Sequence, residues 1–174
     1  PFGRQGHGAR AVSLAAEGTL AREIMSPSAF RNALRLIHAV GGSTNALVHL
    51  AAIAGRCGIE IDLDAFDRLG ADIPVLVDMK PNGKHYMEDL FRAGGLRPIL
   101  RQISHLLELD CPTLTGRTLG EELEAAPDDW PQDVVRPFED PLSSRGGLRG
   151  VRGNLAPRGA IIKTSAASQS LLKH

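Results

Sequence analysis

The sequence of 174 residues predicts an α/β fold, in which the helix-rich end of an α/β domain is followed by the start of a smaller β-rich domain. Apolar residues make up 43% of the chain, which is enough to bury a core. As far as about residue 112 they recur with the period of helices, whereas glycine, proline and short β-type runs dominate afterwards. We therefore assign residues 1–112 to the helical part and residues 113–174 to a linker and the β-rich part.

Two helices that meet at a corner are predicted in the first third of the chain. Ser26 can cap a helix over residues 27–40, and the proline that follows it has the φ angle of a first helical turn. The glycines of "GGSTN" end this helix, and Ser43 or Thr44 can cap the next one, which continues to Gly58. The opening segment "PFGRQGHGAR" resembles neither an initiator region nor a strand, and no helix is assigned there.

The middle of the chain alternates between short elements. Asp62 or Asp64 can cap a short helix that reaches Leu69, and the β-branched, apolar run "IPVLVDM" predicts a buried strand. The turn residues of "KPNGK" follow directly. Further helices are predicted over "HYMEDLFRA", over the amphipathic run "LRPILRQISHLLEL", and over residues 119–125, where Thr118 and Glu121 have the spacing of a capping box.

The last third carries the runs "VVRP", "GGLRGVRG" and "GAIIKTSA", which are typical of short strands. Lys163 and Ser165 are two residues apart, so both point to one face of an extended segment. Such a pair can bind an acid group or activate the serine. A solvated strand end is the alternative, because no base or oxyanion partner is identifiable.

Charge and composition exclude several function classes. Lysine and arginine total 20, as do aspartate and glutamate, so no net charge favours nucleic acid or an anionic membrane. No apolar run reaches the ~20 residues that span a bilayer, and no signal peptide is recognisable. We therefore expect a cytoplasmic protein with neither nucleic-acid nor membrane partners.

The metal-binding residue types show no ligand pattern. Cys57 and Cys111 are expected to be free, buried and apolar in character, because two thiols cannot complete a four-thiolate site. His38, His49, His85 and His105 lack two-ligand spacing and are expected at surface or boundary positions.

Two stretches leave a functional and a structural interpretation open. The residues Gly42, Ser43, Thr44 and Asn45 can offer free N–H groups to an anion at a helix start, or they can form only a cap and a tight corner. Glu88 and Asp89 are adjacent, and neighbouring residues of a helix lie about 100° apart around its axis. The two carboxylates therefore cannot both bind the same ligand atom from one helix face. Stabilisation of a helix N-terminus is the simpler reading for this pair.

Four long motifs, in order along the chain, resemble the middle of the dihydroxy-acid dehydratase and 6-phosphogluconate dehydratase family. They are "GGSTNALVHLAAIA", "DIPVLVDMKPNGKHYMEDLFRAGGL", "TLTGRTLGEEL" and "GGLRGVRGNLAPRGAIIKTSAAS". The similarity covers about residues 19–174, and "IIKTSAASQSLLKH" is more similar to the sugar-acid branch, such as the arabinonate and xylonate dehydratases. "PFGRQGHGAR" and "LRGVRG" depart from the family pattern.

The resemblance implies dehydration of a 2,3-dihydroxy acid to a 2-keto acid. In the family a base removes the C2 proton, an iron–sulfur cluster (2Fe-2S or 4Fe-4S) acts as Lewis acid on the C3 hydroxyl, and Mg²⁺ anchors the carboxylate. The cluster thiolates and most magnesium ligands lie before the matched region, and the serine base and a further carboxylate lie after it. None of these roles can be carried over to this sequence.

The chain is accordingly expected to be a central fragment of a hydro-lyase, inactive alone, holding neither cofactor by itself. The complete enzyme is expected to be a homo-oligomer that acts on a small sugar acid or dihydroxy acid. For this fragment the expected substrate-binding residues are Gly42, Ser43, Thr44, Asn45, Lys163 and Ser165. The alternative is a non-catalytic binding or assembly module derived from the same family.

Overall fold

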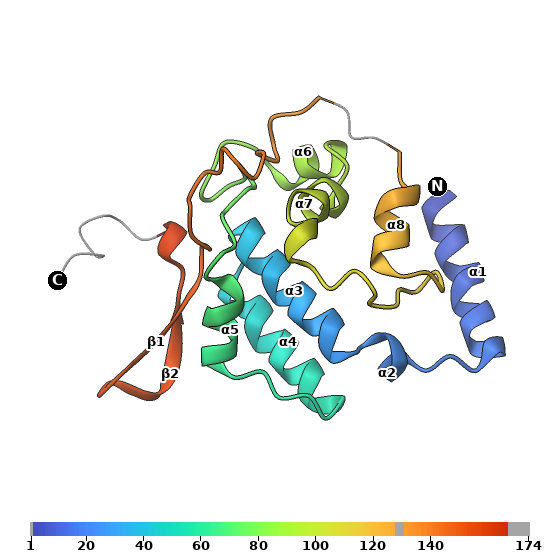
Figure 1. Cartoon of the computed structure of the whole chain (residues 1–174), viewed down its shortest axis with the longest axis horizontal. Helices are drawn as coiled ribbons and strands as arrows, with labels where there is room; N and C mark the ends of the chain where they lie inside the picture. The colour runs from blue at the N-terminus through green and yellow to red at the C-terminus, as the bar shows by residue number, and fades with distance from the viewer. Residues whose placement is uncertain (1, 128–130, 167–174) are drawn as a thin grey trace.

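The computed structural model describes residues 2–127 and 131–166 and confirms the mixed fold (Figure 1). These residues form eight α-helices, two short 3₁₀ helices and one sheet of two antiparallel strands. The helices are α1 (Phe2–Glu17), α2 (Ala21–Ile24), α3 (Pro27–Val40), α4 (Thr44–Arg56), α5 (Leu63–Gly70), α6 (Met87–Arg92), α7 (Leu96–Gln102) and α8 (Leu119–Ala125). The 3₁₀ helices are η1 (Ser104–Leu106) and η2 (Thr164–Ala166), and the strands are β1 (Arg149–Gly153) and β2 (Ala156–Ile162).

The predicted helix starts are confirmed by their capping hydrogen bonds. Ser26 Oγ accepts a hydrogen bond from the third residue of α3 at 3.2 Å, and Asp62 Oδ1 accepts one from Ala65 N of α5 at 2.5 Å. Thr118 and Glu121 form the reciprocal capping box of α8, with bonds of 3.2 and 2.8 Å. Local sequence therefore determines where these helices begin.

The run "IPVLVDM" is buried and extended, as predicted, but it forms single bridges rather than a regular ladder. Leu76 N donates to Ala39 O of α3 at 2.8 Å, and Leu76 O accepts from Arg136 N, also at 2.8 Å. Val75 N bonds Ser143 O at 2.9 Å. The segment is thus enclosed between α3 and the chain after residue 131, and its neighbours contribute isolated residues instead of strands.

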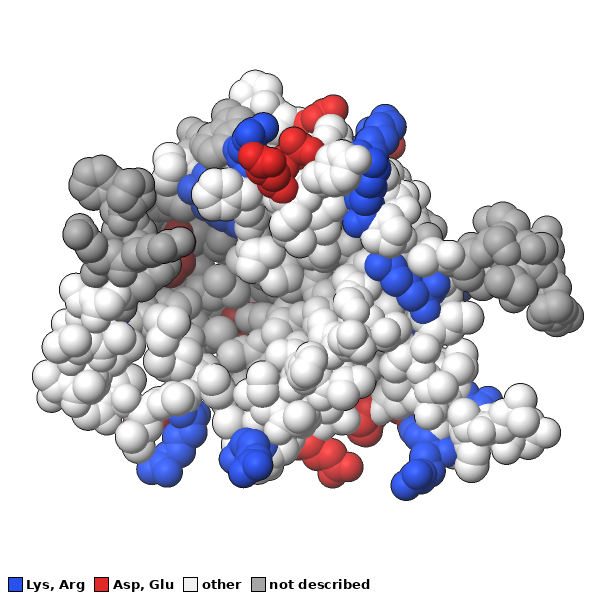
Figure 2. Space-filling model, turned by 180° about the vertical axis from the view of Figure 1, so that it is seen from behind, with Lys and Arg blue, Asp and Glu red and all other residues white. Residues whose placement is uncertain are grey.

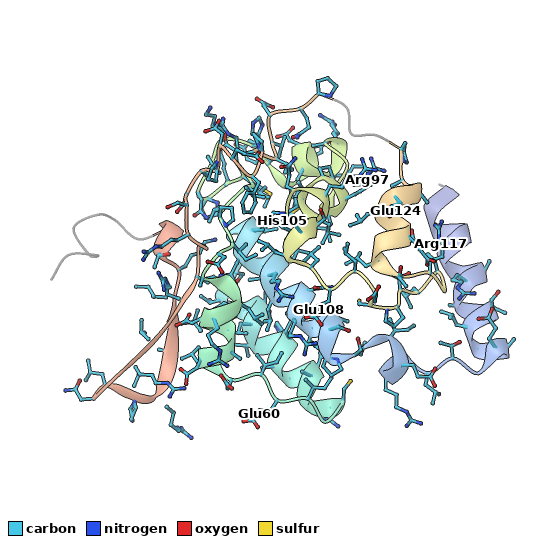
Figure 3. The ribbon with its side chains drawn as sticks, in the orientation of Figure 1. Glu60, Arg97, His105, Glu108, Arg117 and Glu124 are labelled. Atoms are coloured by element: carbon cyan, nitrogen blue, oxygen red, sulfur yellow. The ribbon has the colours of Figure 1, made fainter. Side chains whose placement is uncertain are left out.

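Two other elements differ from the sequence-based expectations. Helix α1 occupies the glycine-rich start, where no helix was expected. The helix expected over "LRPILRQISHLLEL" ends at Gln102, and a 3₁₀ turn follows. The physical reason is tertiary: Asn32 on α3 holds the backbone of Glu108, with Nδ2 to Glu108 O and Glu108 N to Oδ1 both at 2.9 Å, so the chain must turn toward α3. In Figure 3 Glu108 lies beside α3.

The buried apolar side chains form two clusters. The larger one joins the end of α3, the extended run, α6, α7 and Val134 and Val135; its members are Ala39, Ile73, Leu76, Val77, Leu90, Ala93, Ile99, Ile103, Val134 and Val135. The smaller one contains Leu34, Leu47, Phe66 and Leu148, from α3, α4, α5 and the segment before β1. Both clusters therefore include residues from the carboxy-terminal part of the chain.

The hairpin of β1 and β2 packs on α5 through a notch formed by two glycines. A Cβ atom at Gly150 or Gly159 would lie 2.5 Å from atoms of the Leu63 side chain, so only glycine permits this approach. Gly150 N also donates to Asp67 Oδ1 at 2.7 Å, and Arg152 Nη2 lies 3.3 Å from Asp64 Oδ1. In Figure 1 the hairpin projects beyond the helices on the side of α5.

The surface mixes charges of both signs. On the face shown in Figure 2, most lysine, arginine and acidic side chains lie toward the upper and lower margins, and uncharged residues form the centre. Within the described ranges, none of the helices combines the length and the hydropathy required to cross a membrane.

Candidate functional site

The predicted site residues Gly42 to Asn45 form a tight corner between α3 and α4. Gly41 adopts φ 62°, and its N–H and that of Gly42 bond His38 O and Ile37 O at 3.1 and 3.0 Å, which closes α3. Ser43 is the N-cap of α4, with Oγ accepting from Asn45 N at 3.2 Å. The structural interpretation of the corner is therefore confirmed: it contains both a C-cap and an N-cap.

The same corner retains groups that can bind an anion. Among the hydrogen bonds of the described residues, none has the N–H of Ser43 or of Thr44 as its donor. Asn45 is exposed and Thr44 is partly exposed, so their side chains can reach a ligand. Helix α4 has 13 residues, and the positive end of its dipole lies at these groups. Capping and anion binding are thus compatible here, because Ser43 Oγ serves the cap and the two N–H groups remain.

The turn after the extended run lies against this corner, a proximity that the sequence did not reveal. Asn82 belongs to this turn, and its Nδ2 lies 3.5 Å from Gly41 O. The turn also contains a cis peptide bond between Lys80 and Pro81. The ammonium of Lys80 lies over the ring of Tyr86, 3.9 Å from its centroid, and bonds the phenol oxygen. The turn "KPNGK" therefore brings the amide of Asn82 beside the corner, while the ammonium of Lys80 is held by Tyr86.

Asp78 begins this turn and is a buried carboxylate, with 5% of its surface exposed. Its Oδ1 accepts a hydrogen bond from Lys84 N at 2.8 Å, and its Oδ2 lies 3.9 Å from Lys84 Nζ. Gly83 packs so closely that a Cβ there would lie 2.1 Å from Asp78 Oδ1. Asp78 was not singled out from the sequence. The pattern that could have identified it is an acidic residue at the end of an apolar run, followed by a turn that contains glycine. The carboxylate holds the turn in shape.

The predicted pair Lys163 and Ser165 is not on one strand face. Strand β2 ends at Ile162, and residues 164–166 form η2, with Ala166 N bonded to Lys163 O at 3.2 Å. The prediction of an extended segment is wrong because the chain turns as soon as its pairing with β1 ends at Arg149. The Ser165 side chain lies outside the described part of the structure.

Lys163 itself is partly buried, and this burial lowers the pKa of its ammonium group. No hydrogen bond or ion pair of the described residues joins it to the corner at Gly42–Asn45. The structure therefore brings the four corner residues together and places Lys163 on a separate segment that follows the hairpin.

The simpler reading of Glu88 and Asp89 is confirmed. Asp89 Oδ2 accepts a hydrogen bond from Tyr86 N at 2.8 Å at the start of α6, and Glu88 forms an ion pair with Arg92 at 2.7 Å. Both carboxylates are committed to their own helix.

The cysteines and histidines do not form a metal centre in the described ranges. Cys111 is buried, and this burial raises the pKa of its thiol, whereas Cys57 is only partly buried at the end of α4, so its expected burial is wrong. Both thiols are free. No group of three or more His, Cys, Asp or Glu side chains in residues 2–127 and 131–166 could hold a metal ion.

Two hollows of the surface lie away from the corner. One of about 380 Å³ lies between α3, α5 and the loop at residues 59–61, and one of about 500 Å³ lies between α4 and the hairpin. Neither is lined by Gly42–Asn45. Within the corner, Ser43 and Asn45 are exposed, whereas Gly42 and Thr44 are only partly exposed.

Sequence comparison matches nearly the whole chain to one family in two parts. The family model "Dihydroxy-acid/6-phosphogluconate dehydratase N-terminal" matches residues 4–122, and its C-terminal counterpart matches residues 133–174. The first part contains the corner and the second contains the hairpin and Lys163. The contacts of α5 with β1 therefore join the two matched parts.

Individual relatives agree with this match. The chain is 45% identical over 170 residues to an L-arabonate dehydratase of Azospirillum brasilense, covering 96% of this chain and 29% of that protein. It is 46% identical over 169 residues to an L-arabinonate dehydratase of Rhizobium leguminosarum bv. trifolii, again covering 96% and 29%. A dihydroxy-acid dehydratase of Methylococcus capsulatus is 42% identical over 160 residues, with 90% and 28% covered. The chain thus spans less than a third of each of these relatives.

Proposed function

Because the chain belongs to the dihydroxy-acid/6-phosphogluconate dehydratase family, we propose that the complete polypeptide is a hydro-lyase that dehydrates a 2,3-dihydroxy sugar acid to a 2-keto-3-deoxy acid. The observation that carries this proposal is the similarity over 96% of the chain to two proteins named for L-arabonate and L-arabinonate. The dihydroxy-acid dehydratase of Methylococcus capsulatus matches at 42% identity over 90% of the chain, so the preference for a sugar acid rests on identity and coverage taken together.

The proposed reaction removes one water molecule from the substrate. The proton on C2 goes to a base and the hydroxyl on C3 departs, so the electron pair of the C2–H bond becomes the C2–C3 double bond of an enol. The enol then tautomerises: C3 takes a proton from solvent and C2 becomes a carbonyl. A negative carboxylate persists throughout and must be bound by positive or N–H groups.

In this proposal the corner is one of the groups that bind the acid. The N–H groups of Ser43 and Thr44 lie at the positive end of α4, and the side chains of Thr44 and Asn45 can add hydrogen bonds. At Gly42 a Cβ atom would lie 3.3 Å from the Ile37 side chain, so the glycine lets the corner pack closely on α3. Lys163 and Ser165 are assigned to the same substrate, with Lys163 as a cation whose pKa a bound carboxylate would raise again.

The cofactors and the assembly of the complete polypeptide are part of the proposal. An iron–sulfur cluster and Mg²⁺ are assigned to residues outside this sequence, because the described side chains do not fit them. We further propose a cytoplasmic homo-oligomer, inactive when reduced to this fragment.

The experiment that tests the proposal is a substrate comparison. The complete polypeptide, purified without oxygen and with its metal content measured, is incubated with L-arabinonate, with other sugar acids and with a branched dihydroxy acid, and 2-keto acid formation is followed. The proposal requires kcat/KM to be highest for a sugar acid. A metal-loaded preparation that binds these acids without converting any of them would instead support the alternative of a binding or assembly module.

A further inference from the structure

His38 is a buried histidine in the last turn of α3, and the expectation of a surface or boundary position for it is wrong. Only 1% of its surface is exposed. Its ring stacks on Phe66 of α5 with the ring centroids 4.2 Å apart, and its Nε2 lies 3.1 Å from the carbonyl oxygen of Phe66. A carbonyl can only accept, so Nε2 carries the proton and donates it. The ring is therefore fixed on α5 in one tautomer.

Two glycines from different parts of the chain enclose this ring. A Cβ atom at Gly70, at the end of α5, would lie 2.2 Å from the ring of His38. A Cβ atom at Gly146, in the segment that leads into β1, would lie 2.5 Å from His38 Nδ1. No side chain other than hydrogen fits at either position. The imidazole thus occupies a slot whose two walls belong to the two parts that match separate family models.

The slot contains a polar atom without a partner. Nδ1 of His38 is buried and has no hydrogen bond. Burial lowers the pKa of the ring, and of the charged groups that face it, Asp67 of α5 raises the pKa while Arg149 of β1 lowers it. The ring is neutral at neutral pH, and its contribution is shape together with a single hydrogen bond.

The backbone of His38 also takes part in the turn that precedes the Gly42–Asn45 corner. The carbonyl oxygen of His38 accepts the N–H of Gly41 at 3.1 Å, which forms part of the turn that ends α3. Gly42 to Asn45 follow at once. The backbone of His38 is therefore part of the turn that leads into the corner, while its ring lies against Gly146 in the segment before β1.

We propose that His38 is a positioning residue for the substrate site, which holds the Gly42–Asn45 corner at a fixed place relative to the segment that leads to the hairpin and Lys163. This inference rests on the proposed binding of substrate at these residues. It goes beyond that proposal because His38 touches no substrate: it acts by joining α3, α5 and the chain at Gly146 through one ring.

The test uses the complete polypeptide with His38→Leu, His38→Gln and, as control, His49→Leu, which changes an exposed histidine on α4. Backbone hydrogen exchange is measured over residues 41–46 and 146–151, together with KM, kcat and the thermal midpoint. In His38→Leu, exchange is expected to become faster in both segments and KM to rise about tenfold, since small misplacements of binding groups cost much affinity. His38→Gln, which can still donate to Phe66 O, is expected to recover part of both effects, and His49→Leu to change neither.

The outcomes separate this inference from the proposed function. Exchange that stays unchanged at residues 41–46 and 146–151 in both His38 variants would overturn the positioning role, whatever the activity. Faster exchange in both segments with KM unchanged would also overturn it, because the corner would then move without consequence for substrate. If His38→Leu does not fold, His38→Gln decides by the same two readouts. A wild-type enzyme that converts no acid would contradict the proposed function instead, and exchange would still report on the slot.

Discussion

The backbone N–H of Gly150 donates a hydrogen bond to Asp67 Oδ1 at 2.7 Å, which fixes the first strand of the hairpin to helix α5. The side chain of Leu63 lies in the adjacent notch, and its atoms would be 2.5 Å from a Cβ at position 150. The two matched parts of the family are thus in direct contact through backbone and packing. Contacts of this kind tolerate little extra volume.

The first prediction concerns this notch. Gly150→Ala should lower the free energy of unfolding of the complete polypeptide by about 1–3 kcal/mol, because the added methyl group overlaps Leu63. Gly153→Ala is the matched control in the same strand, since nothing lies within 4 Å of its Cβ position. Urea unfolding of both variants checks this. Equal stability of the two would show that Leu63 does not fill the notch in solution.

The second prediction separates the two roles of the corner. Ser43→Ala should lower stability by about 1 kcal/mol because it removes the acceptor of the Asn45 N–H. Thr44 has no part in the cap, so Thr44→Ala should leave the thermal midpoint nearly unchanged and raise the KM for the acid substrate. Calorimetry and steady-state kinetics on both variants provide the measurements. If KM is unchanged in both, the corner is a cap alone.

Most of the helical part could be predicted from local patterns. Ser26, Asp62 and Thr118 each cap the helix that the sequence assigned to them, because a cap depends on residues within one turn. The buried run "IPVLVDM" was recognisable for the same reason: its apolar composition is local. The fold class follows from these elements.

The remaining features depend on residues far apart in the chain. Helix α1 contains Gly3, Gly6 and Gly8, and glycine has a low helix propensity, so the amino-acid composition of this segment did not indicate a helix. The end of α7 depends on Asn32, which is 76 residues away from Glu108. Lys163 and Ser165 appeared to lie on a strand because pairing partners are not visible in sequence. The slot of His38 needs two glycines that only the folded chain brings together.

The third prediction follows from the amide of Asn32, which is 6% exposed and bonds both backbone groups of Glu108. Asn32→Ala should lower the free energy of unfolding by about 2–3 kcal/mol, since two hydrogen bonds are lost and their partners are left poorly solvated. The Glu108 carboxylate also pairs with Arg31, but these groups are partly exposed, so Glu108→Gln should cost less than about 1 kcal/mol. A larger loss in Glu108→Gln than in Asn32→Ala would reverse this assignment.

The fourth prediction is a pH dependence of stability. The pKa of His38 is lowered in the folded state because the ring is buried, whereas in the unfolded chain it returns to the ordinary value of about 6.5. Below that pH the unfolded state therefore binds more protons, and stability falls as the pH falls toward the lowered pKa. Above about pH 7 the ring has no such effect.

The comparison with His38→Gln isolates this contribution, because glutamine does not titrate and all carboxylates are unchanged. The difference in free energy of unfolding between wild type and His38→Gln should be constant above about pH 7, and the wild type should lose stability relative to His38→Gln as the pH falls below about 6.5. Denaturant unfolding across this range supplies the curve. Parallel curves for the two proteins would mean that His38 protonates without cost in the folded state.

Product analysis in deuterated water tests the proposed dehydration most directly. The complete, metal-loaded polypeptide is given L-arabinonate, and the early product is examined by mass spectrometry and NMR. The proposed reaction yields a 2-keto-3-deoxy acid that has lost one water molecule and carries a single deuterium at C3, because C3 takes its new hydrogen from solvent when the enol tautomerises. A product without solvent deuterium at C3, or no 2-keto acid from any sugar acid, would contradict it.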